Sequence, residues 1–211
     1  MQKGKFITFE GIDGCGKTTQ VKLLKQFLES KGITVVITRE PGGTRVAEKI
    51  RKILLDRNNI ELCSRAELLL YLASRAQHTD EIIVPALNDG KWVISDRFTD
   101  SSVAYQGSAR KLGEENVKIM SLFATDGLIP DLTFFLDISP LEASRRMQKQ
   151  GKALDRLEAE ARDFVQKVRE GYLWIAEKEP ERFIVLNGEK SPDDVWADIL
   201  SVFIRKFPSF K

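Results

Sequence analysis

A phosphate-binding pattern near the start of the chain constrains the fold more than any other feature of the sequence. Residues 11–18 read GIDGCGKT and match the pattern G-x-x-x-x-G-K-[ST]. The apolar run Phe6–Phe9 precedes this segment, and a helical pattern follows it from Thr19. The glycines let the backbone turn tightly, so that N–H groups of the loop and of the next helix N-terminus converge on anionic oxygens. The pattern predicts a strand, a phosphate-binding loop and a helix, in that order.

Two side chains of this loop carry its chemistry. Lys17 reaches the β- and γ-phosphates of a nucleotide, and Thr18 can ligate Mg²⁺. Cys15 is most simply a small filler. The residues that we expect to bind the nucleotide are Gly11, Ile12, Asp13, Gly14, Cys15, Gly16, Lys17, Thr18 and Thr19.

The rest of the chain alternates short apolar runs with longer helical patterns, which is typical of right-handed βαβ units. We therefore predict an α/β, three-layer fold of the phosphate-loop NTPase type, with a five-stranded parallel sheet covered by helices on both faces. The predicted strands are Phe6–Glu10, Thr34–Thr38, Trp92–Asp96, Leu132–Asp137 and Phe183–Asn187. The predicted helices are 17–30, 45–56, 65–87, 114–126, 140–149, 158–178 and 191–206.

Composition narrows the class of protein. A chain of 211 residues with 42 % hydrophobic content suits one domain, residues 1–211. The formal charge of +2 shows no bias towards nucleic acid or an anionic membrane as a partner. Two cysteines fit a reducing cytosol, and the N-terminal apolar stretch is too short for a signal peptide. We expect a cytoplasmic protein.

Charged residues gather where the predicted strands end, which is the edge where open parallel sheets bind ligands. Asp96 ends the third strand and is the predicted metal-side carboxylate, with Asp137 as its rival. Arg97 follows Asp96, and its forked guanidinium suits a second phosphate group. Arg39 and Arg51 come from the second strand and the next helix. Three converging arginines would neutralise an acceptor phosphate.

Two further segments have a clear character. Residues 68–73, LLLYLA, are apolar on all sides of a helix, so the helix is either central to the core or packed against a second subunit. We expect a homodimer. Residues 148–153 are polar and lack an apolar face, which predicts an exposed, mobile loop.

Phosphoryl transfer demands mainly the alignment of two polyanions and stabilisation of charge. An acceptor phosphate is largely ionised near neutral pH, because its second pKa is about 6, and it needs no dedicated base. His78 is the sole histidine of the sequence, and we expect no catalytic role for it.

Five segments together resemble the thymidylate kinases, in order and over nearly the whole chain. They are FEGIDGCGKTT at 9–19, TREPGGT at 38–44, ASRAQH at 73–78, DRF at 96–98 with SSVAYQG at 101–107, and LDRLE at 154–158. The resemblance implies transfer of a phosphoryl group from ATP to dTMP, giving dTDP and ADP.

The resemblance also implies roles for residues on the acceptor side. Arg75 would hydrogen-bond thymine, Tyr71 would stack on it, and Gln106 would complete the base pocket. Tyr105 would lie where a 2′-hydroxyl would collide, and Asp13 would accept a hydrogen bond from the 3′-hydroxyl. The residues implied for this substrate are Asp13, Arg39, Glu40, Arg51, Tyr71, Arg75, Arg97, Ser102, Tyr105 and Gln106.

The family carries a catalytic arginine either in the phosphate loop or in a lid. Gly14 occupies the loop position before Cys15, so the lid, at about residues 146–158, should supply it. Arg156 is the candidate, with Lys149 and Lys152 second, and Arg146 would lie against adenine. The predicted catalytic set is Lys17, Asp96, Arg97 and Arg156, and the predicted Mg²⁺ ligands are Thr18 and Asp96.

The sequence departs from the family pattern at two places. Arg45 follows the Gly-Gly-Thr turn where proline is common, and Tyr71-Leu72-Ala73 replaces Phe-Ala-Ala. Neither departure removes a charged ligand, so both bear on substrate preference.

Two other functions would require different residues. A deoxynucleoside kinase would phosphorylate a neutral hydroxyl, with Glu40 as general base and no use for three acceptor arginines. A guanine-specific switch protein would need an Asn-Lys-x-Asp segment, which the sequence lacks.

Overall fold

The computed structural model describes residues 4–150, 155–157, 160 and 162–210, and the sheet lies entirely within them. Its five parallel strands are ordered β2-β3-β1-β4-β5. They are β1 Phe6–Glu10, β2 Val35–Arg39, β3 Trp92–Asp96, β4 Leu132–Asp137 and β5 Phe183–Asn187. The predicted α/β fold class is confirmed.

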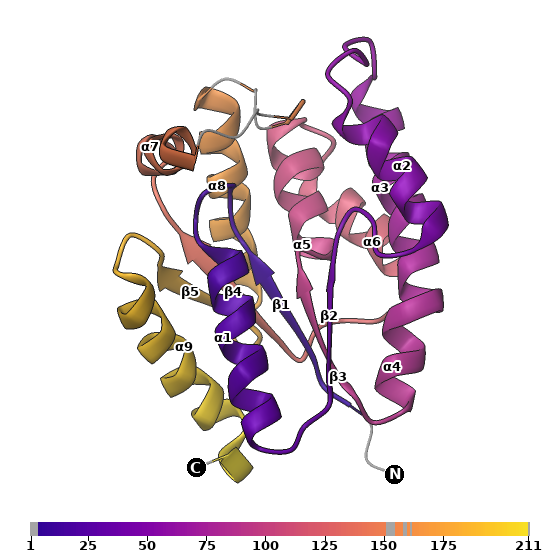
Figure 1. The fold of residues 1–211 in the computed structure, drawn as a ribbon. Coiled ribbons are helices and arrows are strands. Elements are labelled where there is room, and N and C mark those ends of the chain that lie inside the picture. The colour runs from indigo at the N-terminus through magenta and orange to yellow at the C-terminus, as the bar shows by residue number, and fades with distance from the viewer. Residues whose placement is uncertain (1–3, 151–154, 158–159, 161, 211) are drawn as a thin grey trace.

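Helices lie on both faces of the sheet (Figure 1). On one face α1 packs on β1, β2 and β3 and contacts α9, which packs on β5. On the other face α8 packs on β5 and on the segment η2, while α4 packs on β3. The α-helices are α1 Lys17–Ser30, α2 Arg45–Leu55, α3 Ser64–His78, α4 Val84–Asn88, α5 Thr99–Ser102, α6 Glu114–Ala124, α7 Pro140–Gln150, α8 Arg162–Lys178 and α9 Pro192–Lys206. The other helical segments are η1 Thr79–Ile83, η2 Val103–Ala109 and η3 Pro208–Phe210.

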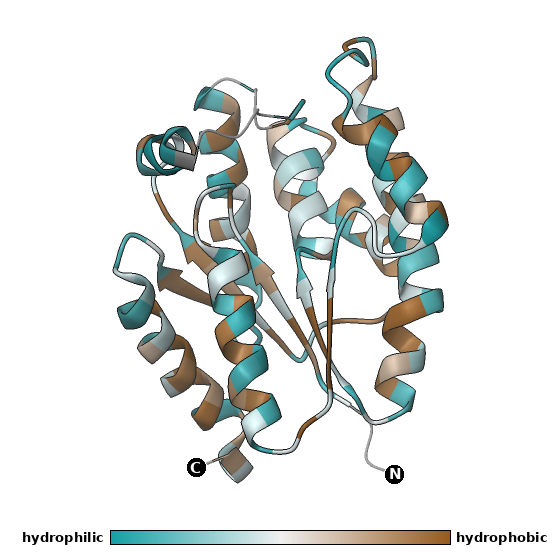
Figure 2. Cartoon of the chain, viewed as in Figure 1, coloured by the Kyte–Doolittle hydropathy of each residue, from teal (hydrophilic) through white to brown (hydrophobic). Residues whose placement is uncertain are grey.

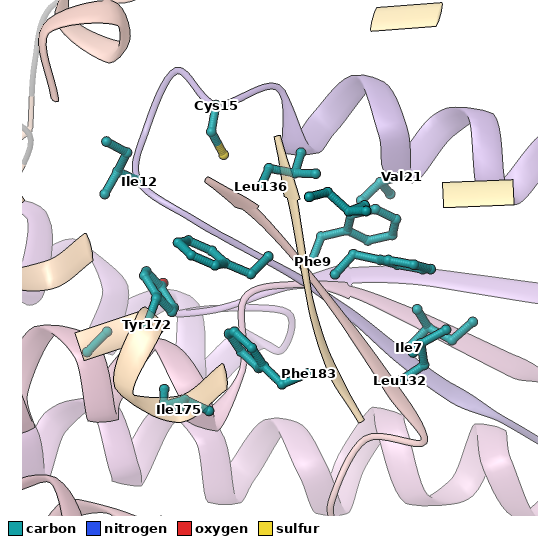
Figure 3. Packing of buried hydrophobic residues seen from close by; sticks show 14 of the residues in the cluster. Ile7, Phe9, Ile12, Cys15, Val21, Leu132, Leu136, Tyr172, Ile175 and Phe183 are labelled. Atoms are coloured by element: carbon teal, nitrogen blue, oxygen red, sulfur yellow. The ribbon is translucent and has the colours of Figure 1, made fainter. Parts of the chain in front are cut away.

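The core fills the space between the sheet and these helices. All five residues of β1 are buried, which explains why its sequence is almost continuously apolar. Figure 3 shows Phe9, Leu136 and Val21 on one side of the core and Tyr172 with Phe183 near α8. In Figure 2 the strands are mostly hydrophobic, whereas the helices carry both hydrophobic and hydrophilic residues.

The strand register brings the site residues level with one another. Asp96 pairs with Phe9 of β1 on one side and with Arg39 of β2 on the other. Three strands therefore end together, and the loops that follow them open on the same edge of the sheet.

Several predicted boundaries differ from the structure. Strand β2 runs one residue later than predicted, because Arg39 still pairs within the sheet. The predicted helix 65–87 is a helical run in three parts, in which a π-helical turn, η1, separates α3 from α4. Pro85 stands at the start of α4, where it donates no backbone N–H. The helical segments 99–109 and η3 were not predicted.

The predicted mobile loop at 148–153 is wrong for its first part, because α7 continues to Gln150. Residues 151–154, 158, 159 and 161 lie outside the described residues, so part of the predicted lid, with Lys152, and the first residues of the predicted helix 158–178 are not described. Within the described part of the chain, no helix is long and apolar enough to cross a membrane.

Candidate active site

A cavity of about 470 Å³ opens at the carboxyl edge of the sheet. It is bounded by the phosphate-binding loop, the ends of β2 and β3, helix α3 and the segment 155–157. Most predicted site residues line it: Asp13, Gly14, Gly16, Lys17, Thr18, Thr19, Arg39, Glu40, Arg51, Tyr71, Arg75, Asp96, Arg97, Ser102, Tyr105 and Gln106. Five predicted residues, all described, are not part of this lining: Gly11, Ile12, Cys15, Arg146 and Arg156.

The phosphate-binding loop joins β1 to α1 with a strongly curved backbone. Gly14 and Gly16 adopt backbone φ angles of 85° and 100°. Residues that carry a Cβ atom rarely adopt such values. Gly16 is also the N-cap of α1, so the N–H groups of the first turn face the cavity. The Lys17 ammonium donates to the carbonyl oxygens of Gly11 at 2.9 Å and Ile12 at 3.3 Å. These bonds hold a buried positive charge within the loop.

Arg97 is the most heavily bonded cation of the cavity. Its guanidinium forms an ion pair with Asp13 at 3.0 Å and donates to the hydroxyls of Ser101 and Tyr172 at 3.3 and 3.1 Å. Its Cζ also lies 5.2 Å from the centre of the Tyr105 ring. The backbone φ of Arg97 is 76°, an uncommon value for a residue other than glycine. Such strain is typical of functional positions, where the surrounding contacts hold it.

The other two predicted acceptor arginines come from the end of β2 and from α2. Arg39 forms an ion pair with Glu48 at 2.7 Å, and this contact holds the pKa of Glu48 at about 2. Arg51 donates to the carbonyl oxygen of Pro41 at 2.7 Å. Both line the cavity with Arg97. The structure thus brings together the three arginines that the sequence placed on separate segments.

A buried chain of polar side chains supports the far end of the cavity. Arg75 donates through Nε to Glu40 at 2.7 Å and through Nη2 to the carbonyl oxygen of Phe98 at 3.0 Å. His78 Nδ1 donates to the other oxygen of Glu40 at 3.0 Å, and its Nε2 lies 2.5 Å from the Thr38 hydroxyl. The remaining nitrogen, Arg75 Nη1, is buried and has no hydrogen-bond partner among the described residues. It is a ready donor for a ligand.

Arg146 and Arg156 occupy positions other than the cavity wall. Arg146 donates to Glu142 at 2.8 Å and to the carbonyl oxygen of Gly188 at 2.9 Å, beside the loop after β5. Arg156 donates to Glu67 at 2.6 Å and to the carbonyl oxygen of Leu54 at 2.9 Å. The sequence predicted neither Glu67 nor Leu54 as a partner.

Sequence reasoning missed a buried network beneath Arg97. The Glu10 carboxylate accepts hydrogen bonds from Phe98 N at 2.7 Å, from the Ser101 hydroxyl at 2.6 Å and from the Tyr172 hydroxyl at 2.9 Å. Burial and the negative charge of Asp100 raise the pKa of Glu10 to about 7. The one feature of the sequence that could have predicted this network is a carboxylate, Glu10, at the end of a mostly apolar strand. No feature of the sequence marks Tyr172 as a member.

We expect the Glu10 carboxyl to make the stability of the protein depend on pH. Its pKa is about 7 in the folded protein against an ordinary 4.5, so the native state favours the protonated group. The stability contributed by the protonated group is fully present below pH 4.5 and is lost as the pH rises towards 7. Glu10→Gln should remove this loss. Urea unfolding at a series of pH values measures it as the difference between the two proteins, and a difference that does not change with pH would contradict the assignment.

Comparison with known proteins agrees with this geometry. The sequence model of the family described as thymidylate kinase matches residues 9–199. A thymidylate kinase of Caldanaerobacter subterraneus subsp. tengcongensis is 58 % identical over 186 residues, which are 88 % of each chain. One of Thermoanaerobacter sp. is 50 % identical over 205 residues, 97 % of this chain and 99 % of the other.

A solved structure shows the same likeness in three dimensions. The crystal structure of thymidylate kinase from Ehrlichia chaffeensis superimposes with a TM-score of 0.77 at 35 % identity, covering 95 % of this chain and 99 % of that one. The match of the family model, the identity of the relatives and the shared fold agree, and the chain belongs to the thymidylate kinase family.

Proposed function

We propose that this protein transfers the γ-phosphoryl group of ATP to dTMP, giving dTDP and ADP for the synthesis of dTTP. The observation that carries the proposal is one cavity that is lined by the phosphate-binding loop, by Arg39, Arg51 and Arg97, and by Arg75, whose buried Nη1 has no hydrogen-bond partner among the described residues. Such a cavity holds two anionic substrates with their phosphates facing one another.

The donor nucleotide lies on the phosphate-binding loop. The N–H groups at the start of α1 and the Lys17 ammonium stabilise the β- and γ-phosphates and the charge that develops between them. Arg146 supports the adenine from outside the cavity wall, beside the loop after β5.

The acceptor phosphate lies among Arg39, Arg51 and Arg97. Its attacking oxygen is largely ionised at neutral pH, because the second pKa of a phosphate ester is about 6, so no side chain has to remove a proton. The structure also argues against Glu40 as a general base for a nucleoside hydroxyl. Both of its oxygens are engaged, by Arg75 and by His78.

The nucleoside of dTMP fills the part of the cavity between α3 and η2. Tyr71 stacks on the base, while Arg75 and Gln106 reach its polar edge. Tyr105 occupies the space of a 2′-hydroxyl, Asp13 accepts from the 3′-hydroxyl, and Ser102, whose buried hydroxyl has no partner among the described residues, lies near the phosphate.

Magnesium fits the donor set at the loop. Thr18 and Asp96 both line the cavity and offer hard oxygen ligands. Within the described residues, no group of three or more His, Cys, Asp and Glu side chains gathers as a metal site. Mg²⁺ is usually held by one or two protein groups, phosphates and waters, so two ligands are sufficient. When bound, the ion supplies charge neutralisation between the phosphates.

The lid arginine Arg156 remains a predicted source of positive charge at the transferring phosphate. Its guanidinium would have to leave Glu67 to reach that position. A large fall in kcat for Arg156→Ala with an unchanged KM for dTMP would support this role. A rise in the KM for dTMP alone would assign Arg156 to the acceptor side instead.

We infer that the enzyme is a homodimer and that a second copy covers an apolar face on α3 and α6, two helices in contact with each other. Leu69, Ile119 and Phe123 of these helices are 56 %, 66 % and 91 % exposed. In contrast, Leu68 and Leu72 of α3 are buried in the core, so the apolar stretch at 68–73 serves both sides. A monomeric mass by light scattering would contradict this inference.

The proposed location is the cytoplasm, and neither nucleic acid nor membrane is a proposed partner. Cys15 and Cys63 are both free, which suits a reducing compartment. The formal charge of +2 gives no general attraction to polyanions.

The release of ADP tests the proposed reaction. We expect fast, Mg²⁺-dependent release with ATP and dTMP, and little release with thymidine or without an acceptor. Thymidine as the better acceptor would favour a deoxynucleoside kinase. Release of ADP at the same rate without any acceptor would exclude a kinase of either kind.

A further inference from the structure

The base end of the cavity rests on one buried carboxylate, that of Glu67 in α3. Its side chain is 1 % exposed. It accepts hydrogen bonds from Gln106 Nε2 at 2.8 Å, from Arg110 Nη2 at 3.2 Å and from Arg156 Nη2 at 2.6 Å. One carboxylate thus joins η2, the loop before α6 and the segment 155–157.

Glu67 determines which way the Gln106 amide points. Burial alone would raise the pKa of Glu67, but the hydrogen bond from Gln106 and the charge of Arg110 hold it below its ordinary value. An ionised carboxylate can only accept hydrogen bonds, so the NH₂ group of Gln106 must face it. The Oε1 atom of Gln106 is then turned away from Glu67, and among the described residues the side chain of Gln106 bonds only through its Nε2. Gln106 lines the cavity, so this oxygen is an acceptor for a ligand.

The cavity therefore presents a fixed pair of groups at its base end. Among the described residues, Arg75 Nη1 is a donor without a partner, and Gln106 Oε1 is an acceptor to which no side chain or backbone group donates. Thymine offers the complementary pair, since O4 accepts and N3–H donates. Cytosine offers the opposite pair, because its N4 amino group donates and its N3 accepts. Each atom of the cytosine edge would meet a group of its own kind.

We propose that Glu67 is a positioning residue for base selection: by holding the Gln106 amide with its carbonyl towards the base, it makes the cavity accept a pyrimidine with an N3–H and reject one without it. The inference rests on the proposed function, because it concerns the base of the same acceptor. Arg156 donates to the same carboxylate, so the segment 155–157 helps to hold the base-selecting group.

The test compares kcat/KM for dTMP, dUMP and dCMP in the wild-type enzyme and in Glu67→Gln. An amide at position 67 can donate as well as accept, so the Gln106 amide is free to turn over. Because one matched hydrogen-bonding pair distinguishes bases by about tenfold or more, we expect the dTMP:dCMP ratio to fall by at least about tenfold, mainly through a higher KM for dTMP. The dTMP:dUMP ratio should not change, since uracil has the same N3–H and O4.

Glu179→Gln is the matched control. Glu179 also holds two cations, Lys118 and Arg182, each at 2.6 Å, but it does not line the cavity. Its substitution should leave both ratios unchanged. A general loosening of the protein would instead change all three substrates together.

A second variant keeps the test decisive if Glu67→Gln does not fold. Glu67→Asp keeps the charge that Arg110 and Arg156 require but withdraws the carboxylate from Gln106, so the dTMP:dCMP ratio should again fall. A wild-type ratio in whichever variant folds would overturn the role of Glu67. If the wild-type enzyme itself does not use dTMP, the proposed function fails, and that outcome is distinct from a failure of Glu67 alone.

Discussion

Substitution of Lys17 by alanine should lower kcat by roughly 10²–10³-fold or more, because removal of a single group that stabilises developing charge has effects of this size. The Lys17 ammonium is buried in the phosphate-binding loop, where the carbonyl oxygens of Gly11 and Ile12 fix it beside the cavity. Because its position is set before the nucleotide binds, we expect it to stabilise the transferring phosphoryl group with little reorganisation. Steady-state rates of dTDP formation at saturating ATP and dTMP measure the effect.

Lys22→Ala is the control for this experiment. Lys22 lies on the same helix, α1, but it is exposed and belongs neither to the loop nor to the lining of the cavity. Its loss should leave the rate within about twofold of the wild-type value, as surface substitutions remote from a site usually have small effects. If Lys17→Ala were as active as Lys22→Ala, the loop would not be the donor site.

The sequence predicted those parts of the site that depend on local pattern or on strand order. The GIDGCGKT segment sets its own conformation through its glycines, and it occupies the expected place between β1 and α1. Asp96, Arg97 and Arg39 could be placed together without any knowledge of side chains, because parallel strands end at one edge. The position of Arg51 near them could be predicted as well, because it lies on α2, the helix that begins after the loop following β2.

The partners of these residues could not be predicted, because they come from contacts between distant segments. Tyr172 reaches Glu10 across 162 positions of the sequence, and Arg156 reaches Glu67 across 89. Closeness in the sequence alone offers Glu160 as a partner for Arg156. In the structure Glu160 pairs with Arg110 instead, while Arg156 shares Glu67 with the same arginine. Which of several acidic neighbours an arginine selects depends on how α3 and η2 pack.

The sequence patterns also failed to predict helical segments in which an α-helix runs into a π-helix. The segment 99–109 contains a π-helical stretch, whose side chains do not follow the 3.6-residue repeat that identifies an α-helix. That stretch carries Tyr105 and Gln106, so this irregular part of the fold also lines the cavity. His78 lies at a similar junction, between α3 and η1, where it bonds Glu40 and Thr38. No pattern in the sequence predicted a role for His78.

Substitution of Arg97 by alanine should raise the KM for dTMP by about 100-fold, because truncating one member of a buried, charged hydrogen-bonding group costs about 2–5 kcal/mol. Its guanidinium lies at the cavity, where it contacts Asp13 and the Tyr105 ring. The affinity for ATP should change little, since the proposed ligands of the donor phosphates are Lys17 and the loop N–H groups. Isothermal titration with dTMP and with a non-hydrolysable ATP analogue separates the two effects.

The control for Arg97 must remove an equally buried arginine outside the cavity. Arg182 meets this condition, since its side chain is 14 % exposed against 15 % for Arg97. It holds Asp100 through two bonds of 2.8 Å and does not line the cavity. Arg182→Ala should therefore lower the melting temperature without a matching loss of dTMP affinity. If Arg97→Ala weakened the binding of ATP instead of dTMP, its guanidinium would belong to the donor site. The assignment of the donor and acceptor sites within the cavity would then have to be exchanged.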